Sequence, residues 1–361
     1  MIKYIGSKRR LVPVLGALLS RAGARTALDL FTGTTRVAQE WKRRGTEVWA
    51  VDLARYAEVL ARCYVTTDAD RIDLAALDDA IFHLQHLTGT DGYVTATFSQ
   101  AARFFQLHNA RRIDAIRDEI ERRWRGHPFY PILLTSLIEA ADRVDSTTGL
   151  QMAYLKQWAP RSHQVLTLRR PSLLTGPGHA VRGDATEVIH QLPEVDLAYL
   201  DPPYNQHRYF TNYHVWETLV AWDAPAYYGV ACKRVDARDA STRSVFNERA
   251  RAADALSAVI AGVRANCVVI SASNEGWLSP DDLLDMATVR GAAEILAFDS
   301  RRYIGAQIGI HNLRGERVGR VSHTRNVEYL VVAGERSLVK RLSALNQEES
   351  SAGHAAAGCR D

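Results

Sequence analysis

Cysteine is scarce in this chain of 361 residues, and no long apolar run is present. The four cysteines, Cys63, Cys232, Cys267 and Cys359, show no paired spacing, which argues against a zinc site and against a disulfide framework. Unpaired thiols are typical of a reducing compartment. No hydrophobic stretch reaches membrane-spanning length, and the sequence opens without an apolar signal segment. We therefore expect a cytoplasmic protein that binds neither a metal nor a membrane.

A strong excess of one charge is also missing. The formal net charge is +4 and the isoelectric point is near 8.9. A net positive charge this small is common among proteins that never bind nucleic acid, and only local clusters of basic residues are informative. Hydrophobic residues make up 47% of the chain, enough to bury a large core. The length fits one large domain with an inserted or flanking one.

Glycine is sparse where a phosphate-binding loop would need it. Residues 26–31 predict a strand, followed by a turn with a single glycine, Gly33, and a helix over 36–44. A second strand, 47–51, ends in Asp52, about 20 residues beyond the turn, where nucleoside-binding units place the acid that holds a ribose. One glycine disfavours a pyrophosphate and favours a cofactor without phosphates, such as S-adenosylmethionine. Taken alone, an arbitrary α/β unit fits equally well.

The most informative segment is Asp201-Pro202-Pro203-Tyr204, which follows an apolar run over 195–200. The run predicts a buried strand, and the two prolines end it in a rigid extended turn. This turn presents a carboxylate, backbone carbonyls that can only accept hydrogen bonds, and an aromatic ring. A planar ring with an amino group, such as adenine, matches these features. An isolated match is also compatible with an ordinary strand end.

Three stretches together resemble the Dam-like class of adenine-specific (N6) DNA methyltransferases. They are the amino-terminal segment Lys3-Tyr4-Ile5-Gly6-Ser7-Lys8, the loop Asp29-Leu30-Phe31-Thr32-Gly33 and the tetrad Asp201-Pro202-Pro203-Tyr204. Their order and spacing also match that class, with the cofactor segments first and the catalytic tetrad last. One departure is Thr35, where many members carry a second small residue, which puts the exact cofactor contacts of this loop in doubt.

The resemblance implies an α/β fold with a Rossmann-like sheet of S-adenosylmethionine-dependent methyltransferases, a terminal β-hairpin and a mainly helical insertion. We expect residues 1–66 to form the cofactor-binding half, 67–175 the insertion with the target-recognition segment, and 176–335 the catalytic half. Residues 336–361 are expected to be disordered, since they become polar and alanine-rich. A hairpin is expected around Arg314-Gly315-Glu316.

The same resemblance implies roles for individual residues. Asp201, Pro202 and Tyr204 are the expected catalytic residues, with Tyr204 stacking on the target base. Asp184 is expected to accept from the cofactor adenine, and a helix N-cap is its other possible role. The expected S-adenosylmethionine-binding residues are Tyr4, Lys8, Asp29, Phe31, Gly33, Thr34, Asp52, Asp184 and Asp201.

Contacts with the target are expected from two regions. Tyr209 and Asn212, in the polar and aromatic segment after the tetrad, are predicted to hold an extruded adenine or the gap it leaves. Arg122 and Arg123, in the arginine-rich insertion, are predicted to contact DNA, although an ion-paired solvent face fits their helical spacing too. The polar loop at 142–149 is either carried back towards the active site or a solvent-exposed linker. A basic stretch at 233–249 suits phosphate contacts or a plain surface loop.

The sequence thus predicts a DNA adenine methyltransferase that acts on double-stranded DNA, with a possible companion restriction endonuclease. An RNA adenine methyltransferase would use the same nucleophile and the same tetrad. A catalytically silent DNA-binding subunit of a restriction system would keep the fold without the activity, but the intact tetrad speaks against it. The recognition site and the oligomeric state are not predicted by any motif in the chain.

Overall fold

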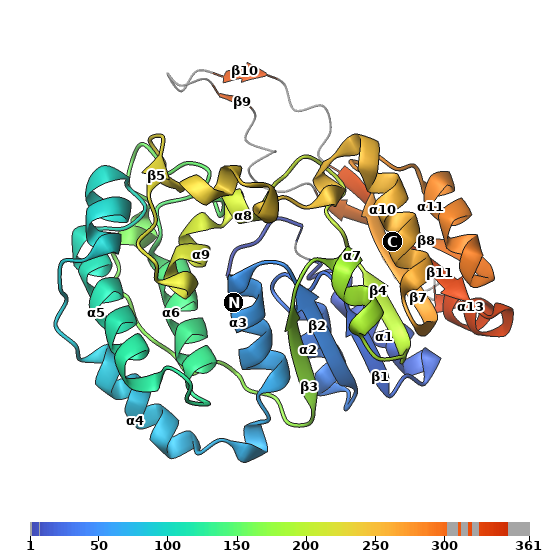
Figure 1. The fold of residues 1–361 in the computed structure, drawn as a ribbon, viewed down its shortest axis with the longest axis horizontal. Coiled ribbons are helices and arrows are strands. Elements are labelled where there is room, and N and C mark those ends of the chain that lie inside the picture. The colour runs from blue at the N-terminus through green and yellow to red at the C-terminus, as the bar shows by residue number, and fades with distance from the viewer. Residues whose placement is uncertain (1, 7, 302–309, 312–316, 320–324, 346–361) are drawn as a thin grey trace, which may run out of the picture.

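The computed structural model describes residues 2–6, 8–301, 310–311, 317–319 and 325–345. Its centre is a seven-stranded sheet in the order β3-β2-β1-β4-β7-β11-β8 (Figure 1). The first five strands in this order pair in parallel, while β11 lies antiparallel between β7 and β8. The bounds are β1 Thr26–Asp29, β2 Glu47–Asp52, β3 Gly178–Arg182, β4 Val195–Leu200, β7 Ala265–Ser273, β8 Ala292–Arg301 and β11 Arg325–Gly334. The expected Rossmann-like methyltransferase sheet with its antiparallel end is confirmed.

Alternation along the strands divides the core into two layers. In β4, Leu197 and Tyr199 face one apolar cluster, and Ala198 and Leu200 face the other, because successive side chains of a strand point to opposite faces. Helices α1 (Val12–Ala22) and α2 (Arg36–Arg43) pack in the first cluster, and α10 (Arg249–Gly262) and α11 (Pro280–Ala287) in the second. The sheet is therefore covered on both faces, as a parallel sheet requires.

A second, helical region adjoins the sheet and continues the first cluster. It contains α4 (Leu74–Gln85), α5 (Leu107–Trp124) and α6 (Tyr130–Val144), at the left of Figure 1. Helix α6 and helix α9 (His214–Ala221) both pack on α3 (Arg55–Ala61), which follows β2. The insertion expected at 67–175 is mainly helical as far as Val144, and the chain from there to β3 is mostly irregular.

Two predictions for the carboxyl-terminal region have different outcomes. The turn predicted at 314–316 lies outside the described residues, but the short strands β9 (Ile310–His311) and β10 (Arg317–Gly319) pair antiparallel on either side of it. The expected disorder from residue 336 is wrong for the first part of that segment. Helix α13 (Arg336–Ser343) packs on β8 and β11, because Val339 and Leu342 on one of its faces are buried in the core. In the described part of the chain, no helix is long and apolar enough to cross a membrane.

Candidate active site

The predicted acids gather at one edge of the sheet because parallel strands end there together. Asp29 and Asp52 end β1 and β2, while Asp184 and Asp201 follow β3 and β4. A cavity with about 840 Å³ of empty volume, counting its open part, lies along this edge. Its lining combines sheet-edge acids with aromatic and small residues: Tyr4, Gly6, Leu30, Phe31, Asp52, Leu53, Ala54, Gly183, Asp184, Ala185, Asp201, Pro203, Tyr209, Phe210, Thr242, Ser244, Phe246 and Asn247.

The turn after β1 is held by two carboxylates. Asp29 does not line the cavity; it lies beneath the turn and accepts hydrogen bonds from Thr32 Oγ1 at 2.8 Å and the Ala38 amide at 3.2 Å. Burial raises the pKa of Asp29 to about 7. The Gly33 amide donates to Asp52 Oδ2 at 2.8 Å, and Asp52 Oδ1 accepts from the Ala54 amide at 2.9 Å. Two backbone donors thus orient the Asp52 carboxylate at the cavity wall, and burial raises its pKa.

Gly33 is needed where it stands. Its φ of +50° lies in the left-handed region, and a Cβ atom there would lie 3.1 Å from the Tyr4 ring. Thr34 is buried in the same turn but, like Gly33, does not line the cavity. Thr35 also has a positive φ, of 62°, at the start of α2. The turn therefore brings its backbone close to the aromatic ring of the amino-terminal segment.

Aromatic rings form two walls of the cavity. On one side, Tyr4 stacks on Tyr213 with ring centroids 4.7 Å apart and on Tyr209 at 5.3 Å. The Tyr213 hydroxyl accepts from the Ile5 amide at 2.7 Å, which ties the amino-terminal segment to α8 (Tyr209–Asn212) and α9. On the other side, Phe31 meets Phe246 edge to face at 5.1 Å. A flat ring system can be enclosed between such walls.

Asp184 has the N-cap role that the sequence also allowed. Its Oδ1 atom accepts from the Thr186 amide at 2.9 Å and begins helix α7 (Ala185–Val188). It also lines the cavity. The cap employs one carboxylate oxygen, so a ligand contact through the other oxygen is compatible with it.

Lys8 lies against Asp201, the acid of the tetrad. Its Nζ atom is 3.3 Å from Asp201 Oδ1 and 5.4 Å from the centre of the Tyr204 ring, and Lys8 does not line the cavity. Burial raises the pKa of Asp201 to about 6, although the nearby Lys8 ammonium opposes the shift. Burial alone would lower the pKa of Lys8, but the surrounding negative charge, above all that of Asp201, keeps it well above its usual value. Both groups are therefore charged in the neutral pH range.

One cavity wall was not found by sequence reasoning. Residues Thr242, Ser244, Phe246 and Asn247 line it, within the stretch interpreted as a phosphate-contacting or plain surface segment. The Asn247 Nδ2 group donates to the backbone oxygen of Asn205 at 2.8 Å and to that of His207 at 3.1 Å. These hydrogen bonds hold the segment 242–247 against the residues that follow the tetrad. In the sequence, the one signal for this wall is Phe246, an aromatic residue in an otherwise mostly polar and basic run.

Among the predicted target contacts, Tyr209 lines the cavity and Asn212 does not. Asn212 is buried, and its backbone oxygen accepts from the Gln151 amide at 2.8 Å. Arg122 and Arg123 lie at the end of α5 next to the start of α6, where the Tyr130 hydroxyl donates to Glu121 at 2.7 Å. Arg122 also pairs with Glu119 at 2.7 Å. The structure does not bring these two arginines to the cavity, and their contact with DNA stays a prediction.

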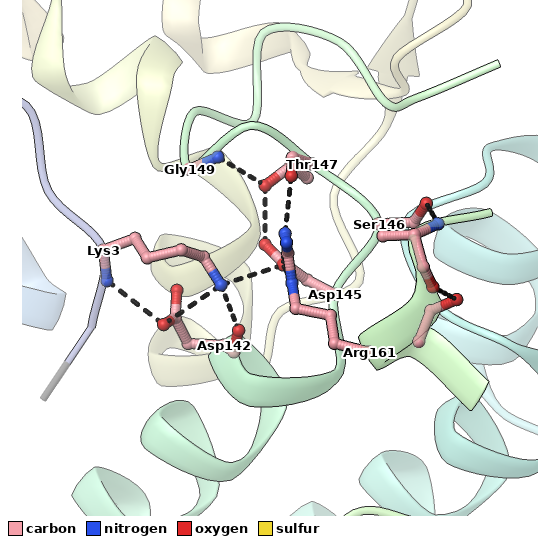
Figure 2. Close-up of polar contacts among 9 residues, drawn as sticks. Lys3, Asp142, Asp145, Ser146, Thr147, Gly149 and Arg161 are labelled. Atoms are coloured by element: carbon pink, nitrogen blue, oxygen red, sulfur yellow. Dashed lines mark hydrogen bonds and ion pairs between the residues drawn. The ribbon is translucent and has the colours of Figure 1, made fainter. Parts of the chain in front are cut away.

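The polar loop at 142–149 is not an exposed linker. Figure 2 shows the Lys3 side chain meeting Asp142 and Asp145, with Arg161 on the far side of Asp145. Lys3 Nζ lies 3.0 Å from Asp145 Oδ1, and Arg161 Nη2 lies 2.6 Å from the same atom. Asp145 and Thr147 are buried, and the Thr147 hydroxyl donates to Asp145 Oδ2 at 2.6 Å. The loop is thus carried back to the segment that holds Tyr4.

A sheet-edge cavity with an Asp-Pro-Pro-Tyr turn defines a methyltransferase-type site, and comparison with known proteins identifies the class. The chain belongs to the D12 class of N6 adenine-specific DNA methyltransferases, whose family model matches residues 4–262. The class implies a methyl donor and a DNA substrate.

Individual relatives have low sequence identity to this chain, but the matches cover most of its length. The chain is 29% identical to the modification methylase StsI of Streptococcus sanguinis over 84% of this chain and 49% of that protein. It is 27% identical to the type II methyltransferase M.NlaIII of Neisseria lactamica over 84% of this chain and 92% of that protein. It is 29% identical to the type II methyltransferase M.CviAII of Paramecium bursaria Chlorella virus 1 over 84% of this chain and 92% of that protein. The chain thus spans about half the length of the first relative and nearly all of the other two.

Proposed function

We propose that this protein transfers a methyl group from S-adenosylmethionine to the exocyclic N6 amine of an adenine flipped out of duplex DNA. The observation that carries the proposal is that Asp201 and Pro203, in the turn after β4, line the sheet-edge cavity, while Pro202 and Tyr204 of the same turn line a smaller cavity that adjoins it at Pro203. Adenine N6 shares its lone pair with the ring and is a weak nucleophile. Asp201 and the Pro202 carbonyl are two acceptors that can hold both N6 hydrogens and favour a pyramidal nitrogen.

The cavity fits a nucleoside cofactor without phosphates. Asp52 presents an oriented carboxylate suited to ribose hydroxyls, Phe31 and Phe246 offer apolar ring surface, and Asp184 offers an acceptor for an amino group. The single glycine of the turn provides little for a pyrophosphate. When bound, S-adenosylmethionine supplies an electrophilic methyl on sulfur; a carbon–nitrogen bond forms as the carbon–sulfur bond breaks, and S-adenosylhomocysteine leaves.

Positioning is the main contribution of the protein to this reaction. Tyr204 offers a ring on which the flipped base can stack, which offsets part of the cost of unstacking it from the duplex. Asp201 and Pro202 orient the amine towards the cavity, so that nucleophile and methyl donor meet in line. After transfer, N6 loses one proton to solvent, and no strong base is required.

The names of the relatives support a place for this enzyme in restriction-modification. Two of those compared are type II methyltransferases and one is a modification methylase. We extend that role to this chain: it would mark one DNA sequence in the cytoplasm and so protect it from a companion restriction endonuclease. Sequencing of N6-methyladenine in DNA from cells that express the chain should show a single motif, and scattered methylation would contradict this role.

The direct test is incubation of the purified protein with tritiated S-adenosylmethionine and either unmethylated duplex DNA or matched RNA, followed by nucleoside analysis. We expect label in N6-methyladenine from DNA. Label from RNA alone would move the substrate class while keeping the chemistry. No label from either, with the cofactor bound, would favour a silent DNA-binding subunit.

A further inference from the structure

The buried lysine beside the catalytic acid has a second carboxylate partner that no motif predicts. Lys8 Nζ lies 3.0 Å from Glu328 Oε2 and 3.3 Å from Asp201 Oδ1. The three side chains are 7%, 17% and 16% exposed, respectively. They come from the amino-terminal segment, from β11 and from the turn after β4, which are far apart in the sequence. Only the fold brings them together.

One cation between two partly buried carboxylates creates a competition. A buried carboxylate without a cation tends to take up a proton, and protonated Asp201 would lose acceptor capacity. An ammonium that pairs only with Asp201 would instead occupy the oxygen that an adenine amine needs. A second carboxylate partner for the ammonium removes this conflict. The ammonium can then stay near Asp201 while it pairs with the other carboxylate.

We propose that Glu328 is a positioning residue for methyl transfer: it holds the Lys8 ammonium so that a carboxylate oxygen of Asp201 can accept from the adenine amine. When the amine enters, Lys8 keeps Glu328 as its partner and yields its contact with Asp201. This inference rests on the proposed function and adds to it a residue outside the three stretches that carry the family resemblance.

The surroundings of the two acids suit this division of roles. Glu328 is fixed on a strand that is paired on both sides, with β7 at Ser273 and with β8 at Phe298. Asp201 lies in a turn at the cavity and is oriented less by backbone pairing. Among the described residues, the titratable groups that face Asp201 are Lys8, Asp29, Tyr199, Tyr204, Tyr209 and Glu328. Lys8 is the cation of this group.

The decisive variant is Glu328→Gln, which keeps the shape and removes the charge. Lys8 then pairs with Asp201 alone, and we expect kcat to fall about 10- to 100-fold, a typical effect of misplaced catalytic groups. The KM for duplex DNA and the Kd for S-adenosylmethionine should be unchanged. The negative charge of Glu328 raises the pKa of Asp201, so its removal should move the acid limb of kcat/KM to lower pH. Glu328→Asp, which keeps the charge, should restore part of kcat.

Glu294→Gln is the matched control, since Glu294 lies on the neighbouring strand β8, opposite Val332. It should leave both kcat and the acid limb at wild-type values. A Glu328→Gln variant with wild-type kcat and an unmoved acid limb would overturn the proposal. So would a loss that merely follows a fall in melting temperature or in cofactor binding, because that would give Glu328 a structural role only.

A measurement without substrate separates this inference from the proposed function. Carbon-13 NMR titration of the carboxyl groups, with the Asp201 signal assigned through Asp201→Asn, should show a lower Asp201 pKa in Glu328→Gln than in the wild type. An unchanged value would reject the inference even in an active enzyme. Failure of the wild type to methylate DNA, with the lowered value observed, would reject the function and leave the coupling between Glu328 and Asp201 intact.

Discussion

Two lysines five residues apart in the amino-terminal segment build opposite kinds of charge cluster. Lys3 contacts Asp142 and Asp145, and Asp145 is also bound by Arg161 and Thr147, so its oxygens are engaged on several sides. Lys8 also contacts two carboxylates, but one of them, Asp201, lines the cavity. The first cluster is closed and fixes a loop. The second is open, and one acid of it can exchange a cation for a ligand.

This difference distinguishes two roles of an ion pair: stabilising the fold and setting what a cavity can bind. Breaking a closed cluster leaves charges without partners and costs stability. Changing an open cluster at a cavity alters what the cavity can accept, and the stability cost is smaller because solvent reaches it. The variants below test this contrast.

Asp201→Ala removes the acceptor of the open cluster. We expect single-turnover methyl transfer to fall at least about 1,000-fold, because one N6 hydrogen loses its partner in the transition state. Binding of S-adenosylmethionine, measured by calorimetry, should stay near wild type. Loss of cofactor binding would show that Asp201 serves the cofactor more than the adenine.

Tyr204 covers the open cluster, with Lys8 Nζ 5.4 Å from its ring centre. Tyr204→Ala should reduce transfer about 10- to 100-fold, as expected from the stacking energy of a base on an aromatic ring. Tyr204→Trp keeps a stacking face and should retain part of the activity. Equal losses in the two variants, measured with the same DNA, would argue against stacking.

Lys3→Met breaks the closed cluster and should act on stability. Its side chain is 34% exposed, so solvent screens part of the effect, and we expect the free energy of unfolding in urea to fall by about 1–2 kcal/mol. Arg43→Met removes an exposed pair with Glu40 and should cost less than about 1 kcal/mol. A Lys3 variant as stable as the Arg43 variant would show that the closed cluster does not hold the loop.

Asp29 differs from both clusters, because it is buried with no ion pair among the described residues. Its pKa of about 7 exceeds the usual value, so the folded state binds a proton that the unfolded state has released. Its contribution to stability is therefore full below about pH 4 and lost as the pH rises through 7. Asp29→Asn should flatten the decline of unfolding free energy between pH 4 and 7 by up to about 1.4 kcal/mol per pH unit. An unchanged slope in urea titrations at several pH values would refute this.

Most of the sheet could be predicted from the sequence because local signals agreed with the fold. The apolar runs at 26–31, 47–51 and 195–200 each became a strand, since their residues are buried on both faces of a parallel sheet. Helix α13 was missed because its polar, basic composition masks two buried residues, Val339 and Leu342. The insertion expected to be mainly helical is irregular from Val144 to β3. The polar contacts that hold the loop at its start come from Lys3 and Arg161, and contacts between distant segments leave no local pattern.

The candidate site divides in the same way. Asp52, Asp184 and Asp201 could be placed at one edge because each follows a predicted parallel strand. The position of Lys8 at Asp201, instead of in the cofactor cavity, depends on how the amino-terminal segment packs against β11 and the turn after β4. Phe246 and Asn247 reach the cavity by a long connection whose path leaves no local pattern.

The local sequence was enough to predict the chemistry: an acid, two prolines and an aromatic ring after a buried strand indicate an acceptor site for an amine, because residues adjacent in the chain form this motif. The tertiary structure alone decided which charges share the site. Lys8, Asp201 and Glu328 meet because three segments converge at one sheet edge, and electrostatic coupling over about 3 Å depends on distance in space, whatever the separation along the chain.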